Sequence, residues 1–167
     1  MSHFAVAVFT TDKKQSIKKL LAPYKYCEWD DYRIGGRYKD TLITKTTNTL
    51  KEPKNCDAAF VSDIDFKAMR QRDIAKLRPY GKALNDIIYG RRYMRERYPT
   101  KEEYIKRETA FGTYAVITPD GEWHCPDDMD TYSIHEDERE WDLTYYEQFI
   151  KPALENGWYM TIVDCHN

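Results

Sequence analysis

Two histidines and an aspartate, side chains capable of acid/base or metal chemistry, lie near the two ends of this 167-residue chain. His3 is near the amino end, whereas Asp164 and His166 are two residues apart near the carboxyl end. Because side chains alternate between the faces of a β-strand, a terminal strand would place Asp164 and His166 on one face and Cys165 on the other. If that strand pairs beside the first strand, all three polar side chains converge. We therefore predict His3, Asp164 and His166 as catalytic residues.

Two chemistries suit this set of side chains. Two imidazoles and a carboxylate can bind a divalent metal that keeps open coordination positions, or they can act as an acid/base pair in which Asp164 orients a histidine. A third interpretation is structural, with the terminal residues holding the ends of the fold in place. The residue types leave these alternatives open and name no metal. Cys165 is disfavoured as a nucleophile because its histidine neighbour would point to the other face of the strand.

The segment 29–38, with the sequence Trp-Asp-Asp-Tyr-Arg-Ile-Gly-Gly-Arg-Tyr, is the densest local group of functional side chains. A glycine pair lets the backbone turn and bring amide N–H groups towards an anion, and each guanidinium can bind a phosphate or carboxylate through two parallel hydrogen bonds. The aromatic rings can stack on a base or a sugar. The alternative is a tight turn in which the arginines pair with Asp30 and Asp31 and the aromatic rings fill the core. We predict a ligand-binding site formed by Trp29, Arg33, Gly35, Gly36 and Arg37.

Charge is strongly segregated along the chain, although the net charge is only −2. The segment 67–107 has 13 basic and 5 acidic residues, whereas the segment 108–142 has 1 basic and 11 acidic residues. This asymmetry argues against a DNA mimic, which would be acidic throughout, and against a nonspecific DNA-binding domain, which would be positive overall. Either the basic segment packs beside the acidic one, or it offers a face to RNA, DNA or an acidic protein. The second alternative predicts nucleic-acid or partner contacts by Arg91, Arg92, Arg95 and Arg97.

Several stretches have the composition of β-strands. Residues 4–9 are apolar at every position, as in a central strand buried on both faces, and residues 158–164 combine β-branched and aromatic side chains. Residues 112–117 and 122–125 flank Thr-Pro-Asp-Gly, a strong hairpin signal. Further short strands are expected within 24–46 and at 58–61.

Helical spacing of apolar residues occurs in the intervening segments. The sequence predicts a helix around 17–21 that stops at Pro23, a helix over 66–78 capped by Asp63 or Asp65, a helix over 82–97, a short helix that begins at Thr100, and a final helix over about 143–155. The acidic stretch 126–140 has few aliphatic side chains, so it is expected to form an exposed loop.

The order of these elements favours one α+β domain over 1–167, with a single, mainly antiparallel sheet, helices largely on one face and a basic helical insertion at 67–107. Hydrophobic residues make up 41% and charged residues 32% of the chain, which excludes wholesale disorder. The longest apolar run is far shorter than the roughly 20 residues that span a bilayer, and no leader pattern precedes it. Four cysteines without a C-x-x-C pair indicate reduced thiols. From the short apolar run we expect no membrane contact.

Four motifs together resemble a family of bacteriophage and prophage proteins that carries no established reaction. They are the opening Met-Ser-His-Phe, the segment 29–38, Asp-Ile-Asp-Phe at 63–66 and the closing Val-Asp-Cys-His at 163–166. Members of that family tend to have Trp where this chain has Tyr38, and the basic segment looks like an insertion peculiar to some of them. The resemblance implies a phage or prophage origin and a location in the cytoplasm of the bacterial host. It adds weight to His3, Arg37, Asp164 and His166, although a family alone does not fix a mechanism.

Three functional hypotheses follow. In the first, a phage accessory protein active in counter-defence binds a phosphate-bearing small molecule, such as a nucleotide, through the Arg/Gly-Gly/His site; its enzymatic version is a metal-dependent phosphoester hydrolase. In the second, the basic helices inhibit a host defence complex, such as a CRISPR effector, through contacts with its protein or RNA. The third is a structural or assembly role.

Overall fold

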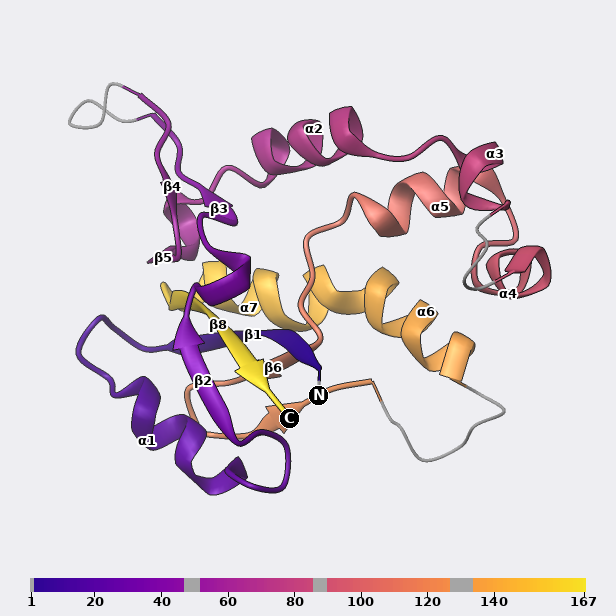
Figure 1. Ribbon diagram of the computed structural model, residues 1–167. Helices are drawn as coiled ribbons and strands as arrows, with labels where there is room; N and C mark the ends of the chain where they lie inside the picture. Colours follow the sequence, from indigo (N-terminus) through magenta and orange to yellow (C-terminus); the bar gives the residue numbers. More distant parts are fainter. Residues whose placement is uncertain (1, 47–51, 86–89, 127–133) are drawn as a thin grey trace.

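Figure 1 shows the computed structural model of the protein, which describes residues 2–46, 52–85, 90–126 and 134–167. The strands are β1 His3–Thr10, β2 Asp31–Ile34, β3 Leu42–Ile43, β4 Asn55–Cys56, β5 Ala58–Phe60, β6 Ala115–Ile117, β7 Trp123–His124 and β8 Tyr159–His166. The helices are α1 Ile17–Leu21, α2 Phe66–Lys76, α3 Tyr80–Ala83, α4 Gly90–Arg97, α5 Lys101–Glu108, α6 Ile134–Tyr145 and α7 Lys151–Glu155. A π-helical turn, Tyr146–Ile150, joins α6 to α7. The elements confirm the expected α+β class.

The main sheet has the strand order β2-β8-β1-β6-β7, and β5 shares with β2 the outer edge of β8. Every pairing in it is antiparallel except that of β1 with β6. The fully apolar run of β1 lies at the centre, where residues 6–9 are completely buried. The predicted central strand and the predicted β6–β7 hairpin are thus confirmed. A separate two-stranded sheet pairs β3 with β4.

The two faces of the sheet are covered unequally, as Figure 1 shows. On one face, Tyr145 and Phe149 of the α6–α7 region pack against Ala7 and Ile162. On the other face, the cover is mainly α1, which buries Leu21 among side chains of β1, β6 and β8. Helices therefore lie largely on one face, as the sequence predicted. None of the helices described is long and apolar enough to cross a bilayer.

Local sequence explains where the helices begin. The Asp65 carboxylate caps α2 by accepting a hydrogen bond from the Ala68 N–H at 2.9 Å. The Thr100 hydroxyl caps α5 in the same way, with the Glu103 N–H at 3.1 Å. Each cap satisfies a backbone donor that the first helical turn leaves without a partner, which fixes the start of the helix. Both predicted starts are confirmed.

Two expectations about helices were wrong. The single helix over 82–97 is instead divided, because α3 ends at Ala83 and α4 begins at Gly90, which has a φ of 75°. The acidic stretch 126–140 is not a loop throughout, because α6 begins at Ile134; residues 127–133 lie outside the described part of the chain. Trp141 and Tyr145, four residues apart, give α6 an apolar side that packs against the sheet core. Its acidic side chains find basic partners on neighbouring helices, which the local sequence does not reveal.

Candidate functional site

The two ends of the chain lie side by side in the main sheet (Figure 1). β1 and β8 pair along their whole lengths, and His3 is opposite His166. On the other edge of β8, Asp31 is opposite His166 and Arg33 is opposite Asp164. Because cross-strand neighbours project from the same face, this register brings the terminal residues together with the arginine-containing segment that follows Trp29.

Each histidine of this group is held by a carboxylate. His3 Nδ1 lies 2.9 Å from Asp164 Oδ1, and His166 Nδ1 lies 2.7 Å from Asp30 Oδ1. The two rings meet edge to face, with centroids 4.9 Å apart and an interplanar angle of 66°. A carboxylate at Nδ1 favours the tautomer protonated there and leaves Nε2 as the exchanging position. No described residue hydrogen-bonds to either Nε2. The site therefore contains two Asp–His pairs, whereas the sequence analysis foresaw one.

The two carboxylates occupy different environments. Asp164 is 4% exposed. Burial acts to raise its pKa, but hydrogen bonds from the Arg37 backbone N–H and from His3 outweigh burial and hold the pKa below its usual value. Asp30 is 52% exposed, and the hydrogen bond from His166 is the main cause of its lowered pKa. Both groups are therefore ionised at neutral pH and can stabilise a protonated imidazole.

Gly36 allows the backbone to approach Asp164. The Asp164 Oδ2 accepts a hydrogen bond of 2.9 Å from the Arg37 N–H, one residue beyond the glycine. Gly36 has a φ of 51°, and a Cβ at this position would collide with the Asp164 carboxylate. A residue without a side chain is required here for both reasons.

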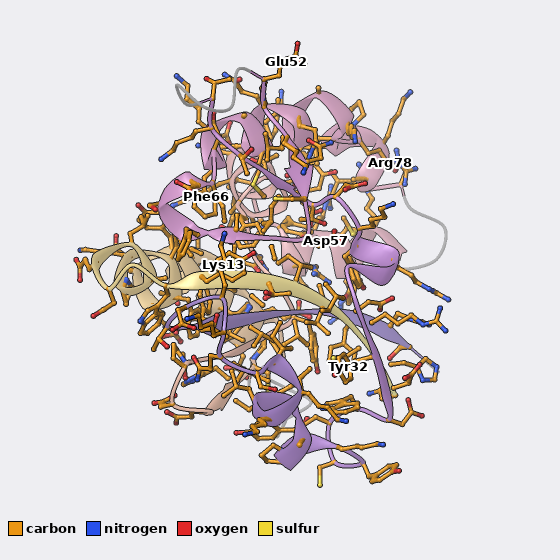
Figure 2. The ribbon with its side chains drawn as sticks, turned by 90° about the vertical axis from the view of Figure 1, so that its left-hand side faces the viewer. Lys13, Tyr32, Glu52, Asp57, Phe66 and Arg78 are labelled. Atoms are coloured by element: carbon orange, nitrogen blue, oxygen red, sulfur yellow. The ribbon has the colours of Figure 1, made fainter. Side chains whose placement is uncertain are left out.

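Gly35 makes an equivalent approach to a second carboxylate, that of Asp57. It has a φ of 69°, and a Cβ there would collide with the carboxylate of Asp57, which also accepts a 2.6 Å hydrogen bond from the Asp40 N–H. Figure 2 shows Asp57 near the turn that follows β2, with Tyr32 lower on that strand. The turn amides of Arg37 and Asp40 thus bind the protein's own carboxylates, and the Gly35 N–H donates to the Ile162 carbonyl oxygen. These three amides are not available to an external anion, which corrects the expectation for this part of the turn.

The Asp–His pairs line an open hollow of about 860 Å³. Tyr32, Arg33 and Arg37 complete its wall together with Asp31 and Gly36. Both guanidiniums belong to exposed residues and make no hydrogen bond or ion pair with the described part of the chain. Asp30 bonds to His166 instead of an arginine. The alternative of a turn closed by arginine–aspartate pairs is therefore not what the structure shows, and the arginines face the hollow unpaired.

Two predicted ligand-binding residues, Gly35 and Trp29, do not line this hollow: Gly35 lies against Asp57, and Trp29 belongs to the core. The Trp29 side chain is buried in the core beneath α1, with 5% of the residue exposed, and it meets the Tyr32 ring edge to face at a centroid distance of 5.2 Å. The prediction that Trp29 stacks on a ligand is corrected to a core role. Tyr32 takes the place at the hollow that the sequence analysis gave to the tryptophan.

The thiol and metal chemistries receive no support from the geometry. Cys165 lies on the opposite face of β8 from its two neighbours and is fully buried, and burial raises the pKa of its thiol to about 12. Over the described ranges, no group of three or more His, Cys, Asp and Glu side chains is arranged to hold a metal ion. Because each imidazole Nδ1 is bound to a separate carboxylate, the arrangement suits proton transfer at Nε2.

A second hollow of about 540 Å³ adjoins the first at His3, which lines both. It lies between the start of β1 and helices α5 and α6, and Phe4, Tyr38, Tyr114 and Trp141 contribute aromatic surface. Tyr114 is 45% exposed and packs on Phe4 with ring centroids 5.0 Å apart. The sequence analysis missed this hollow because its wall comes from segments far apart in the chain. It also missed Asp30 as the partner of His166. The signal that could have identified Asp30 is its position directly before the start of a strand.

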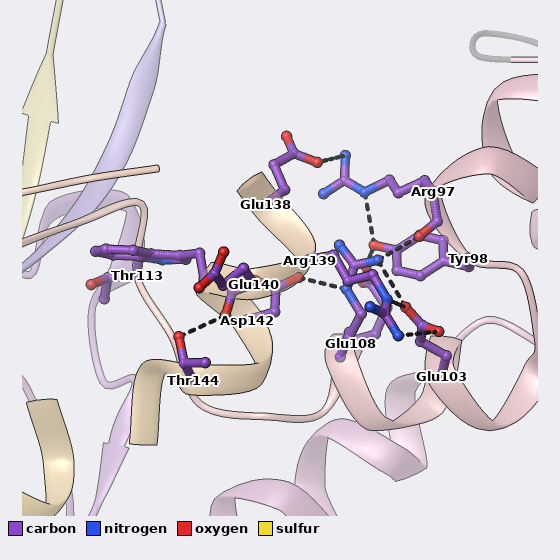
Figure 3. Close-up of polar contacts among 12 residues, drawn as sticks. Arg97, Tyr98, Glu103, Glu108, Thr113, Glu138, Arg139, Glu140, Asp142 and Thr144 are labelled. Carbon is purple, nitrogen blue, oxygen red and sulfur yellow. Dashed lines mark hydrogen bonds and ion pairs between the residues drawn. The ribbon is translucent and has the colours of Figure 1, made fainter. Parts of the chain in front are cut away.

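The basic helices pack beside the acidic helix, as Figure 3 shows. Arg97 pairs with Glu138 at 3.5 Å, and Arg139 reaches from α6 to Glu103 at 2.6 Å. Within the same layer, the fully buried side chain of Arg107 bonds to Asp142 on α6 at 2.9 Å. Of the two interpretations of charge segregation, internal packing is confirmed for these pairs.

The four arginines predicted to contact a partner differ in availability. Arg97 belongs to the internal network and also bonds to the Tyr93 hydroxyl, so it is removed from an open basic face. Arg92 bonds to Glu96 within the same helix at 2.8 Å. Arg91 and Arg95 are exposed on α4. The structure thus leaves a smaller basic face than the composition suggested.

Comparison of the chain with protein-family models, with curated proteins and with solved structures finds no match. The functional argument therefore rests on the chemistry of the two hollows.

Proposed function

We propose that the protein binds a phosphate-bearing small molecule in the hollow between β1, β8 and the turn after β2. The observation that carries this proposal is the placement of two exposed guanidiniums, those of Arg33 and Arg37, beside two imidazoles whose Nε2 atoms have no bond to the described residues. Guanidinium groups bind phosphate through paired, charge-assisted hydrogen bonds, and imidazole adds a further donor when protonated.

The carboxylates in the wall do not cancel this attraction. Asp164 is already bonded to His3 and to the Arg37 N–H, and Asp30 to His166. Both carboxylates thus have hydrogen-bond partners within the protein, whereas the two guanidiniums make no hydrogen bond or ion pair with the described residues. Asp31 is the remaining carboxylate of the wall, and it disfavours a polyanion more than it disfavours a single phosphate group.

The biological setting is part of the same proposal. A phage or prophage accessory protein that acts in counter-defence within the bacterial cytoplasm would gain from sequestering or processing a nucleotide signal. Inhibition of a defence complex, such as a CRISPR effector, through exposed Arg91 and Arg95 is the second candidate function. It has the weaker support, because Arg97 and Arg107 of the basic segment are held by acidic residues of α6.

Titration calorimetry with AMP and with inorganic phosphate, on wild type and on Arg33→Ala and Arg37→Ala variants, tests the proposal. Each substitution is expected to weaken binding about tenfold or more, equivalent to about 1.4 kcal/mol, because it removes a charge-assisted contact. Arg92→Ala is the matched control, since its guanidinium is exposed but bonded to Glu96 outside the hollow. Wild-type affinity in both hollow variants, or absence of binding to wild type, contradicts the proposal.

A further inference from the structure

We propose that the two Asp–His pairs form a metal-independent acid/base couple that hydrolyses a phosphodiester bond in a small nucleotide, whose base occupies the adjoining aromatic hollow. This inference rests on the proposed function, because the scissile phosphate is the group that the arginines bind. It goes further by assigning a reaction, a substrate class and a role to each histidine.

The geometry of the imidazoles is the first argument. Proton transfer at both sides of a phosphate requires one base and one acid within reach of the same phosphorus centre. His3 and His166 are 4.9 Å apart at their ring centroids, and each is anchored at Nδ1 by a carboxylate, at 2.9 and 2.7 Å. Anchoring through Nδ1 fixes the ring orientation, so that Nε2 is the atom available for proton exchange. The two pairs line the same hollow.

The arginines supply the electrostatic part of the chemistry. Negative charge on the nonbridging oxygens must be stabilised as water adds to phosphorus, and preoriented guanidinium groups do this without a metal ion. Arg33 is the cross-strand neighbour of Asp164, and Arg37 follows the glycine turn whose backbone binds the same carboxylate. The backbone that carries each arginine is thus held next to Asp164, the partner of His3.

The adjoining hollow assigns the two roles. His3 lines both hollows, whereas His166 lines only the larger one. A nucleoside whose base lies against Phe4, Tyr114 and Trp141 places its ester oxygen next to His3. His3 is then the general acid for the leaving oxygen, and His166, which does not line the second hollow, is the general base for water.

The bond changes balance without a co-reactant. Neutral His166 takes a proton from water at Nε2 while the water oxygen forms a bond to phosphorus. The bond from phosphorus to the ester oxygen breaks, and protonated His3 gives its Nε2 proton to that oxygen. The products are a phosphomonoester and an alcohol. Exchange of one proton from His166 to solvent and of one from solvent to His3 restores the starting state.

The size and charge of the site favour a small nucleotide over a nucleic-acid strand. Affinity for a strand comes from many phosphate contacts along a continuous basic surface. Here Asp30 and Asp31 border the hollow, and the basic helices nearby are paired with α6. The two hollows, of about 860 and 540 Å³, have the volume of sites that bind small molecules.

Any pH dependence involves the charged groups around both rings. Those that face the histidines are Asp30, Asp31 and Arg33 at β2, Arg37 and Tyr38 from the glycine turn, Asp164 on β8, and, across the second hollow, Arg97, Arg107, Glu108, Glu138 and Asp142. Because the mechanism needs one neutral and one protonated imidazole, the rate is expected to pass through a maximum with pH. A single sigmoidal rise would contradict the paired roles.

The test uses the full chain in EDTA with 2′,3′-cyclic AMP, 3′,5′-cyclic AMP and adenylyl-3′,5′-adenosine as probes, and products are separated by chromatography. Hydrolysis of at least one probe is expected, with one oxygen from ¹⁸O-labelled water in the phosphomonoester. His3→Ala and His166→Ala should each lower kcat about 100-fold or more. His124→Ala on β7, whose ring bonds to Thr118, is the matched control and should retain wild-type turnover.

The possible failures separate this inference from the proposed function. If AMP binds and Arg37→Ala weakens that binding, but no probe is cleaved, the catalytic inference is overturned and phosphate binding stands. If neither AMP nor any probe binds, both are overturned. Turnover that appears only after Mn²⁺ or Zn²⁺ is added, or that survives in both histidine variants, also overturns the acid/base couple. Circular dichroism of each variant establishes that it is folded before its rate is interpreted.

Discussion

At the scale of single residues, the site depends on side chains that orient other side chains. His3 and His166 face the hollow, but Asp164 and Asp30 determine which nitrogen does so. Gly36 in turn leaves space for the Asp164 carboxylate next to the turn. The residues that orient the histidines are therefore expected to be as sensitive to substitution as the histidines themselves.

Replacement of Gly36 by alanine is expected to destabilise the protein by about 3 kcal/mol, since it combines an unfavourable positive φ with a collision against Asp164. Gly157→Ala is the matched control, because Gly157 has a φ of 66° but no atom within 4 Å of an added Cβ. That control should lose about 1 kcal/mol. Urea denaturation measures both; equal losses would show that the approach of the carboxylate to the turn has no energetic consequence.

Asp164 should make the stability of the fold sensitive to acid. The folded-state pKa of Asp164 lies below its unfolded value, so its ionised form stabilises the fold above about pH 4. That contribution is lost as pH falls through the folded-state pKa. Asp164→Asn should therefore lower the free energy of unfolding at pH 7 by about 1–3 kcal/mol. It should also flatten the decline in stability between about pH 5 and pH 3.

Urea titrations at several pH values measure this difference. Asp30→Asn provides the comparison at an exposed carboxylate, where solvent screening makes the expected effect smaller. An Asp164→Asn variant with the same acid slope as wild type would contradict the assignment.

At the scale of elements, one buried cation, Arg107, takes part in the contact between α5 and α6. The Arg107 side chain is fully buried, its Nε bonds to Asp142 at 2.9 Å, and its guanidinium lies 4.8 Å from the centre of the Tyr98 ring. Burial raises the pKa of Asp142, and the arginine partly offsets that effect. Loss of the arginine would leave a mostly buried carboxylate without its partner.

Arg107→Met is accordingly expected to lower the free energy of unfolding by about 3 kcal/mol, the magnitude seen when one member of a buried pair is removed. Arg92→Ala, which breaks an exposed pair within α4, should change it by less than about 0.5 kcal/mol. Thermal and urea unfolding of both variants measure the difference. Similar small effects in the two variants would show that the helix contact does not depend on the buried cation.

Local patterns predicted elements better than they predicted contacts. The apolar run of β1, the Thr-Pro-Asp-Gly hairpin and the Thr100 cap each depend on neighbours in sequence, and the structure confirms them. The start of α6 could not be found in this way, because its acidic side chains become favourable only beside Arg97 and Arg107. A helix stabilised by distant partners carries a weak local signal.

The candidate site shows the same division. Alternation along a strand correctly put Asp164 and His166 on one face, and pairing of the end strands brought them to His3. The pairing of His166 with Asp30 and the burial of Trp29 depend on how β2 meets β8, which no local pattern specifies. The convergence of His3, Asp164 and His166 was therefore predictable, whereas the pairing of His166 with Asp30 was not.

At the scale of the whole molecule, opposite charges that are separated in sequence are brought together in space. The basic segment and α6 neutralise one another where they touch, so the net positive charge of that segment is not a measure of free binding surface. The hollow at the paired ends of β1 and β8 has the opposite character, since Arg33 and Arg37 make no hydrogen bond or ion pair with the described residues. The proposed binding site therefore lies near the paired strands β1 and β8 and not on the basic segment.

The backbone link between the two ends has a practical consequence. Ser2 and Asn167 exchange N–H···O hydrogen bonds of 3.0 and 3.2 Å, and both are close neighbours of the histidines in the sheet. An affinity tag fused next to Ser2 or Asn167 would therefore leave the fold at the rim of the proposed binding site. A polyhistidine tag would add imidazoles beside the native ones and bring in metal from the purification resin. Untagged or fully cleaved protein is the appropriate material for assays of ligand binding and turnover.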